Sequence, residues 1–159
     1  MMNRRTLILW GTLLLVLLVA NAIIYDRERL RAEGTLVYLE LAPVDPRSLI
    51  QGDYMDLRYR ITQDIENANG PERGRVVIRL DDRDVARFVR LYDGHLEDDE
   101  QLLRYEIRPT GVQIGAESFF FEEGHGSDYE DARYAELRVS EDGDVTLTAL
   151  RDANFRKLG

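Results

Sequence analysis

Residues 132–152, ARYAELRVSEDGDVTLTALRD, contain the strongest fold signal in this chain. Two runs in which apolar and polar residues alternate, 132–140 and 145–152, flank the tetrapeptide EDGD at 141–144. Alternation with a period of two is typical of a strand with one buried face, and Asp-Gly between two such runs favours a tight turn. These residues therefore predict an antiparallel β-hairpin.

Similar alternation recurs through the rest of residues 35–159. The other expected strands cover residues 35–42, 54–62, 75–80 and 102–109, with shorter ones in GVQIG and SFFFEEG. Residues 63–74, QDIENANGPERG, are polar and are expected to form a loop. Many short strands with turn residues between them predict a mainly β fold, either a small antiparallel β-sandwich or a partly open barrel.

Residues 81–94, DDRDVARFVRLYDG, fit two interpretations. Their apolar residues follow helical spacing. The same residues also fit the second strand of a hairpin that turns at 81–84. We favour the strand.

The N-terminus has a different composition. An uncharged run extends from Thr6 to Tyr25, with Trp10 near its start. A helix of that length spans about 30 Å, the thickness of the hydrocarbon core, and Trp and Tyr rings favour the headgroup zones at its ends. The run predicts a single transmembrane anchor. A cleaved signal peptide is the alternative, because Ala20-Asn21-Ala22 has the small-x-small form of a cleavage site. We favour the anchor because residues 23–25 continue the apolar run past that site.

The orientation of the anchor rests on a weaker signal. Arginines occur on both sides of the apolar run, so the positive-inside rule does not decide. Signal-like N-termini usually stay in the cytoplasm, which places the following domain outside, in the periplasm, with the anchor in the inner (cytoplasmic) membrane. The expected organisation is a cytoplasmic tail (1–5), the transmembrane anchor (6–25), a short helical stem (26–34) and an extracytoplasmic β-rich domain (35–159).

Composition excludes several kinds of site. The chain has no cysteine, which excludes disulfides, zinc–thiolate sites and cysteine nucleophiles. It has 30 acidic and 21 basic residues and a net charge of −9, so its surface would repel nucleic-acid phosphates. The acidic runs DDRD, EDDE, SDYED and EDGD do not match the spacing of a calcium-binding loop. We expect these runs to be solvated turns, and we expect no metal or cofactor.

Two sets of residues resemble catalytic groups without the required arrangement. His125 lies beside Ser127 and Asp128 in a glycine-rich loop, where close neighbours do not supply the separate positions of a nucleophile and its base. Ser48 lies in a turn near Gly-Asp, but its base would have to be Lys157, the only lysine. We therefore expect no catalytic residues and no enzymatic activity.

The stretch QGDYMDLRY, residues 51–59, predicts a strand with two different faces. Met55, Leu57 and Tyr59 alternate on one side and are expected to be buried. Gly52-Asp53 is expected to form the turn that starts the strand.

The opposite side of this strand has a polar pattern that recurs in residues 132–140. The two sets, in the same Tyr/acid/Arg order, are Tyr54, Asp56 and Arg58, with Arg60 after them, and Tyr134, Glu136 and Arg138. Strands with such sets could pair in one sheet, where cross-strand ion pairs contribute roughly 0.2–1 kcal/mol each. Two interpretations remain: an ordinary solvated face with arginine stems on tyrosine rings, or a face that binds a partner, since Tyr and Arg often anchor interfaces.

Gly52, Asp53, Tyr54, Leu57 and Tyr59 spell G-D-Y-x-x-L-x-Y, which resembles the signature of the bacterial GDYXXLXY protein family. The resemblance extends to the N-terminal membrane segment, LAPVDPRSLIQGDYMDLRY, FFFEEG and ARYAELRV. It implies a membrane-anchored envelope protein and identifies no catalytic residue. Members often occur beside or fused to multi-pass membrane proteins, so the resemblance implies an accessory or interaction module with an integral membrane protein as partner. The alternatives are an extracytoplasmic ligand- or ion-binding sensor domain and, less favoured, an envelope hydrolase.

Overall fold

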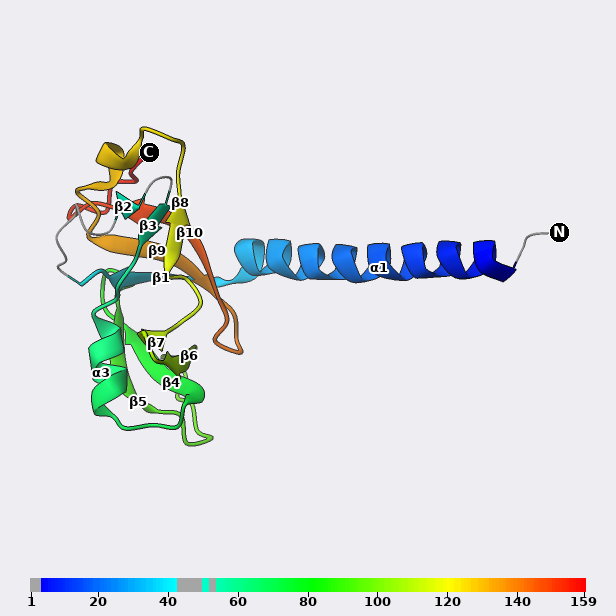
Figure 1. Cartoon of the computed structure of the whole chain (residues 1–159). Helices are drawn as coiled ribbons and strands as arrows, with labels where there is room; N and C mark the ends of the chain where they lie inside the picture. Colours follow the sequence, from blue (N-terminus) through cyan, green and yellow to red (C-terminus); the bar gives the residue numbers. More distant parts are fainter. Residues whose placement is uncertain (1–3, 43–49, 52–53) are drawn as a thin grey trace.

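The computed structural model describes residues 4–42, 50–51 and 54–159, and consists of one long helix and a β-rich domain (Figure 1). Helix α1, Arg4–Glu33, is continuous and projects from the domain. Its segment Ile8–Tyr25 has a mean hydropathy of 2.3, and none of it is buried against the rest of the chain. By length and composition this helix is able to cross a membrane, a property that retained anchors share with signal sequences.

The predicted hairpin is present. Strands β9 (Tyr134–Val139) and β10 (Val145–Arg151) pair antiparallel, and β1 (Thr35–Glu40) pairs with the other edge of β9. One face of this sheet is buried. Val37 and Leu137 lie directly opposite each other on that face, and both side chains are fully shielded from solvent.

A second sheet contains four strands in the order β5-β4-β6-β7. Their bounds are Arg73–Leu80 for β4, Ala86–Leu91 for β5, Glu100–Arg108 for β6 and Gly111–Gln113 for β7. The strand interpretation of residues 81–94 is thereby confirmed. The Asp81 carboxylate accepts hydrogen bonds from the backbone N–H groups of Arg83 (3.0 Å) and Val85 (3.1 Å), which fixes the turn before β5.

The third sheet is small and corrects one prediction. It contains β2 (Ile50–Gln51), β3 (Tyr54–Asp56) and β8 (Ser118–Phe120) in the order β2-β3-β8. The strand predicted over residues 54–62 therefore ends at Asp56. The predicted turn at Gly52-Asp53 lies outside the described residues.

The predicted loop over residues 63–74 is also wrong in its first part. Helix α3, Ile61–Asn67, occupies it. Ile61 and Ile65 are four residues apart and both are buried, so one apolar face packs the helix against the domain while its other face is polar. The spacing of buried residues changes from two to four after Ile61, where the helix begins.

Backbone contacts join the sheets into a curled, partly open half-barrel. The N–H of Arg104 in β6 donates to the carbonyl of Gly143 in the β9–β10 turn (2.9 Å), and the N–H of Tyr38 in β1 donates to the carbonyl of Asp84 before β5 (2.9 Å). The turn thus closes part of the free edge of β6. The mainly β, antiparallel fold predicted from the sequence is confirmed, and the curled sheet corresponds to its barrel version.

Candidate functional site

The buried residues of the G-D-Y-x-x-L-x-Y signature stabilise the fold. Leu57 is 2% exposed, and its N–H donates to the carbonyl of Glu117 (2.6 Å). Tyr59 is 1% exposed, and its hydroxyl donates to the carbonyl of Ala116. Burial, with smaller contributions from Glu117 and Asp56, raises the pKa of Tyr59 well above its ordinary value, so the phenol remains a hydrogen-bond donor. Both signature residues hold the segment that leads into β8.

The outer side of β3 carries an aromatic pair, a half-buried tyrosine and an exposed phenylalanine. Tyr54 in β3 lies directly opposite Phe120 in β8, and their ring centroids are 5.9 Å apart. Phe120 is 74% exposed, whereas its neighbour Phe119 turns inward and contacts the ring of Tyr129 at 5.0 Å. Strand β8 is the last strand of its sheet. We call Tyr54 and Phe120 the aromatic edge.

The predicted pairing between the two Tyr/acid/Arg strands is wrong. β9, with Tyr134, Glu136 and Arg138, pairs with β1 and β10, whereas β3, with Tyr54, pairs with β2 and β8. Arg58 follows β3 and is exposed. The same order of side chains does not select a partner, because pairing follows the buried faces: the apolar residues of β9 alternate in register with those of β1.

The β9 set makes contacts within the chain. The Tyr134 ring stacks on Phe155 of the C-terminal tail, with centroids 4.4 Å apart. Burial raises the pKa of Glu136, but hydrogen bonds from Thr148 and Arg151 outweigh burial and hold that pKa below its usual value. These contacts favour the interpretation of this face as a structural surface that secures the tail.

Arg138 connects the sheet to α1. Its Nη1 donates to the carbonyl of Gly34 (3.0 Å), the residue that follows the helix. A cation at the C-terminal end of a helix satisfies an unpaired carbonyl and complements the helix dipole. Arg138 therefore connects β9 to the residue that directly follows α1.

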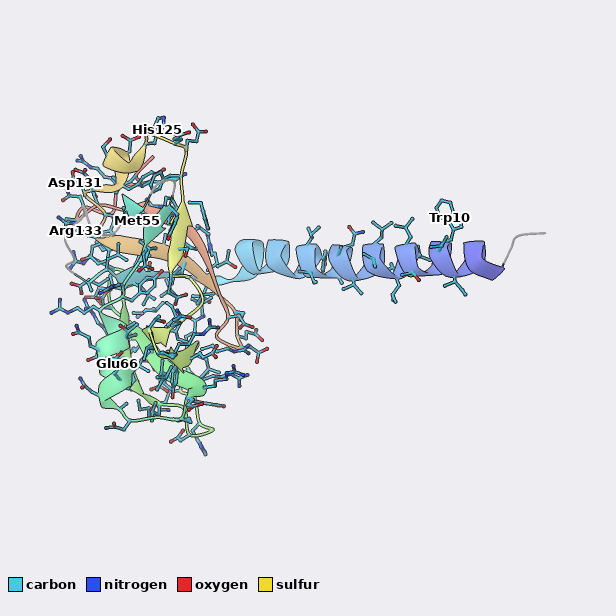
Figure 2. All side chains as sticks on the ribbon, in the orientation of Figure 1. Trp10, Met55, Glu66, His125, Asp131 and Arg133 are labelled. Atoms are coloured by element: carbon cyan, nitrogen blue, oxygen red, sulfur yellow. The ribbon has the colours of Figure 1, made fainter. Side chains whose placement is uncertain are left out.

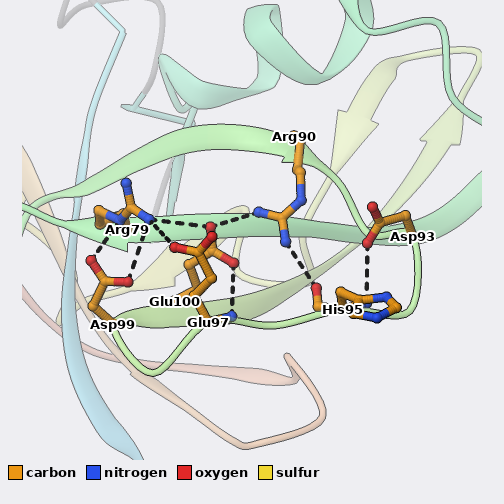
Figure 3. A network of polar contacts seen from close by, with 7 residues as sticks. All are labelled: Arg79, Arg90, Asp93, His95, Glu97, Asp99 and Glu100. Atoms are coloured by element: carbon orange, nitrogen blue, oxygen red, sulfur yellow. Dashed lines mark hydrogen bonds and ion pairs between the residues drawn. The ribbon is translucent and has the colours of Figure 1, made fainter.

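The buried carboxylate of Glu100 forms the centre of an ion-pair network whose other members are partly exposed (Figure 3). Its side chain is 1% exposed, and its carboxylate accepts hydrogen bonds from Arg90 (2.6 Å), Arg79 (3.4 Å) and the N–H of Glu97 (3.1 Å). The Arg90 hydrogen bond is the main cause that lowers the pKa of Glu100. With these donors the buried carboxylate has hydrogen-bond partners that compensate for its loss of water. The network therefore holds the loop between β5 and β6 against the sheet. The expectation that the run EDDE is wholly solvated is wrong at Glu100.

Four arginines line a groove on the four-stranded sheet. We call Arg73, Arg75, Arg104 and Arg108, with Tyr92 and Gln113 beside them, the arginine groove; its volume is about 590 Å³. Adjacent strands β4 and β6 position these arginines by their alternation and register. The groove was not among the sites predicted from the sequence, although the alternating arginines of the two strands are a visible signal.

Three carboxylates contact the groove arginines. Glu106 pairs with Arg73 (2.7 Å) and Arg108 (3.1 Å). From the β9–β10 turn, Asp144 pairs with Arg104 at 3.0 Å, and Asp142 approaches Arg75 at 3.6 Å. Four guanidinium groups against three carboxylates leave one positive charge in excess on a chain with net charge −9.

His125 and its neighbours form an exposed pair. His125 directly precedes the short helix η1, Gly126–Tyr129, and its Nδ1 lies 2.9 Å from the carboxylate of Asp128 in that helix. The hydrogen bond to Asp128 is the main cause that raises the pKa of His125. Ser127, between them in the sequence, is exposed. Of the second set, Ser48 lies outside the described residues, and the backbone of Lys157 forms an isolated antiparallel β-bridge with that of Arg151. Among the described residues, no group of three or more His, Asp or Glu side chains could hold a metal ion.

Comparison with known proteins gives one match. A family model described as GDYXXLXY protein matches residues 16–150, which is most of the chain and includes the second half of the apolar helix. The comparisons with curated proteins and with solved structures find no match.

Proposed function

Since this chain belongs to the GDYXXLXY protein family, we propose that it is a membrane-anchored interaction module whose β-rich domain binds an integral membrane protein, and that it has no catalytic activity. The observation that carries the proposal is the aromatic edge. Phe120 is the most exposed large apolar side chain in the described part of the domain after α1. Covering a phenylalanine ring stabilises an assembly by roughly 1.5–3 kcal/mol, and aromatic residues often dominate interface energies.

The position of the aromatic edge supports the same function. Phe120 lies on β8, at the end of its sheet, where backbone groups are available to a partner strand or loop. The ring of Tyr54 lies beside it, and Leu57 and Tyr59, which follow β3 along the chain, are buried in the core. A rigid support reduces the entropy lost when an interface forms.

The proposed anchor is α1, in the inner (cytoplasmic) membrane with residues 35–159 in the periplasm. The helix continues without a break from the apolar segment Ile8–Tyr25 to Glu33, and Arg138 binds the Gly34 carbonyl that follows. In Figure 2, Trp10 lies near the end of α1 that is far from the domain. An uncleaved helix would hold the domain close to the membrane surface, within reach of a neighbouring membrane protein.

Reporter fusions test this topology. Alkaline phosphatase fused to the C-terminus should be active, because it folds only outside the cytoplasm, and a fluorescent protein that requires the cytoplasm should be dark. Both fusion proteins should keep α1, as intact mass measurement of the membrane fraction would show. A bright fluorescent fusion with inactive phosphatase would reverse the orientation, and loss of residues 1–22 would identify a signal peptide.

The partner itself is tested by isolating the full chain from membranes solubilised in mild detergent. We expect one integral membrane protein to copurify in a fixed ratio with the tagged chain. Isolation of the tagged chain alone, at expression levels near the native one and after crosslinking, would contradict the interaction role.

A further inference from the structure

Two arginines of the groove face each other across adjacent strands. Arg75 in β4 and Arg104 in β6 are direct partners in the antiparallel register, so their side chains leave the same face of the sheet side by side. Like charges at such positions destabilise a sheet. An arrangement that opposes folding, on a chain with an excess of acidic residues, indicates a role other than stability.

The guanidinium groups of this pair have unused hydrogen-bonding capacity. Each guanidinium has five N–H donors. The contact of Arg75 with Asp142, at 3.6 Å, is too long for a hydrogen bond, and the contact of Arg104 with Asp144 is a single ion pair at 3.0 Å. Within the part of the chain that the structure describes, neither guanidinium donates a hydrogen bond of good geometry to a side chain.

The Glu100 network provides the contrast. There, Arg90 donates a short hydrogen bond (2.6 Å) and Arg79 a longer one (3.4 Å) to a carboxylate whose side chain is 1% exposed. In the arginine groove, the carboxylates of Asp142 and Asp144 are 76% and 48% exposed. Exposed ion pairs contribute little to stability and are readily exchanged for another anion.

We propose that the arginine groove binds a small ligand with two or more anionic oxygen groups, phosphate or carboxylate, between Arg75 and Arg104. The planar guanidinium group matches both kinds of oxyanion through paired N–H donors. The groove volume of about 590 Å³ lies in the range of small-molecule sites. Tyr92 and Gln113 at its wall supply neutral polar groups that orient a ligand.

Asp142 acts in this site as a weak internal competitor. It lies at the tip of the β9–β10 turn and approaches Arg75 without a hydrogen bond. A ligand oxyanion replaces it at Arg75, and removing its charge favours the ligand. The site lies wholly within the β-rich domain, so it does not depend on the proposed membrane partner.

Titration calorimetry of the full-length chain in zwitterionic detergent micelles tests the proposal, at low salt because screening weakens exposed charges. The soluble probes are inorganic pyrophosphate and citrate. A phospholipid source of the same chemistry is tested with short-chain cardiolipin, which carries two phosphate groups, against short-chain phosphatidylcholine. Binding of the soluble anions identifies a free ligand, and binding of cardiolipin alone identifies a lipid headgroup.

Variants separate this site from general electrostatics. The Arg75→Gln/Arg104→Gln double variant should weaken binding by at least about tenfold, since it removes both oxyanion forks. Asp142→Asn should strengthen binding several-fold. The matched control is Arg58→Gln/Arg133→Gln, which removes two exposed arginines outside the groove and should leave binding unchanged; Figure 2 labels Arg133.

Three results would overturn the proposal. The first is that no probe shows saturable binding up to about 10 mM. The second is that the groove double variant and the control double variant weaken probe binding equally. The third is that Asp142→Asn binds the probes more weakly than the unmodified chain. Thermal unfolding of each variant without probe checks its fold. If the double variant does not fold, Arg75→Gln alone and Asp142→Asn decide, because their predicted effects have opposite signs.

Discussion

Replacing Leu57 with alanine should lower the free energy of unfolding of the β-rich domain by about 2–5 kcal/mol, as for other core leucines. Leu57 is 2% exposed and belongs to the main hydrophobic core. The truncated side chain would leave a cavity, because the backbone at this position is held by the hydrogen bond from its N–H to Glu117. Arg58→Ala is the matched control: the next residue is exposed, so its loss should change stability by less than about 0.5 kcal/mol.

Pulse proteolysis in urea measures these changes in the full-length chain. Fluorescence of the single tryptophan does not report on the domain, because Trp10 lies in α1, and circular dichroism is dominated by the long helix. The Leu57→Ala midpoint should fall well below the wild-type midpoint while the Arg58→Ala midpoint stays close to it. Equal midpoints for the two variants would contradict the burial of the signature leucine.

Gly143→Ala should lower the free energy of unfolding by more than the roughly 1–3 kcal/mol that backbone strain alone costs. Gly143 has φ +87°, in the left-handed region that favours glycine, and a Cβ there would lie 2.9 Å from the backbone nitrogen of Arg104. A backbone atom cannot move aside as a flexible side chain can. The substitution would therefore push the β9–β10 turn away from β6 and break the hydrogen bond that joins the two sheets.

Gly115→Ala separates strain from close approach. Gly115 has a similar φ of +91°, but a Cβ at this position would have no heavy atom within 4 Å. Urea midpoints from the same proteolysis assay should fall further for Gly143→Ala than for Gly115→Ala. Similar losses in the two variants would mean that the turn does not hold the sheets together.

The predictions that the structure confirms rest on local patterns. The hairpin of β9 and β10 was predictable because its alternation and its Asp-Gly turn lie within one short segment. Helix α3 was not, because it has only seven residues and two buried isoleucines within a polar sequence. Its stability comes from packing on the domain, which a short window of sequence does not contain.

The surface sites depend on contacts between distant segments. The sequence placed Tyr54 on the outer side of its strand, but the exposed aromatic edge exists only because β8, more than 60 residues later, pairs with β3 in the register Tyr54↔Phe120. The arginine groove likewise requires the register that places Arg75 opposite Arg104. Alternation within a strand predicts its faces, whereas the choice of neighbouring strand follows from the whole fold.

Copurification with surface variants is the most direct test of the interaction role. The full chain with Phe120→Ser should retain its fold but lose most of its integral membrane partner, because the variant removes the ring from the aromatic edge. Leu96→Ser is the matched control, since Leu96 is also an exposed apolar side chain (47%) but lies in the loop between β5 and β6. Quantified from crosslinked membranes, the partner should be lost with Phe120→Ser and retained with Leu96→Ser. Full retention of the partner by Phe120→Ser would contradict the account.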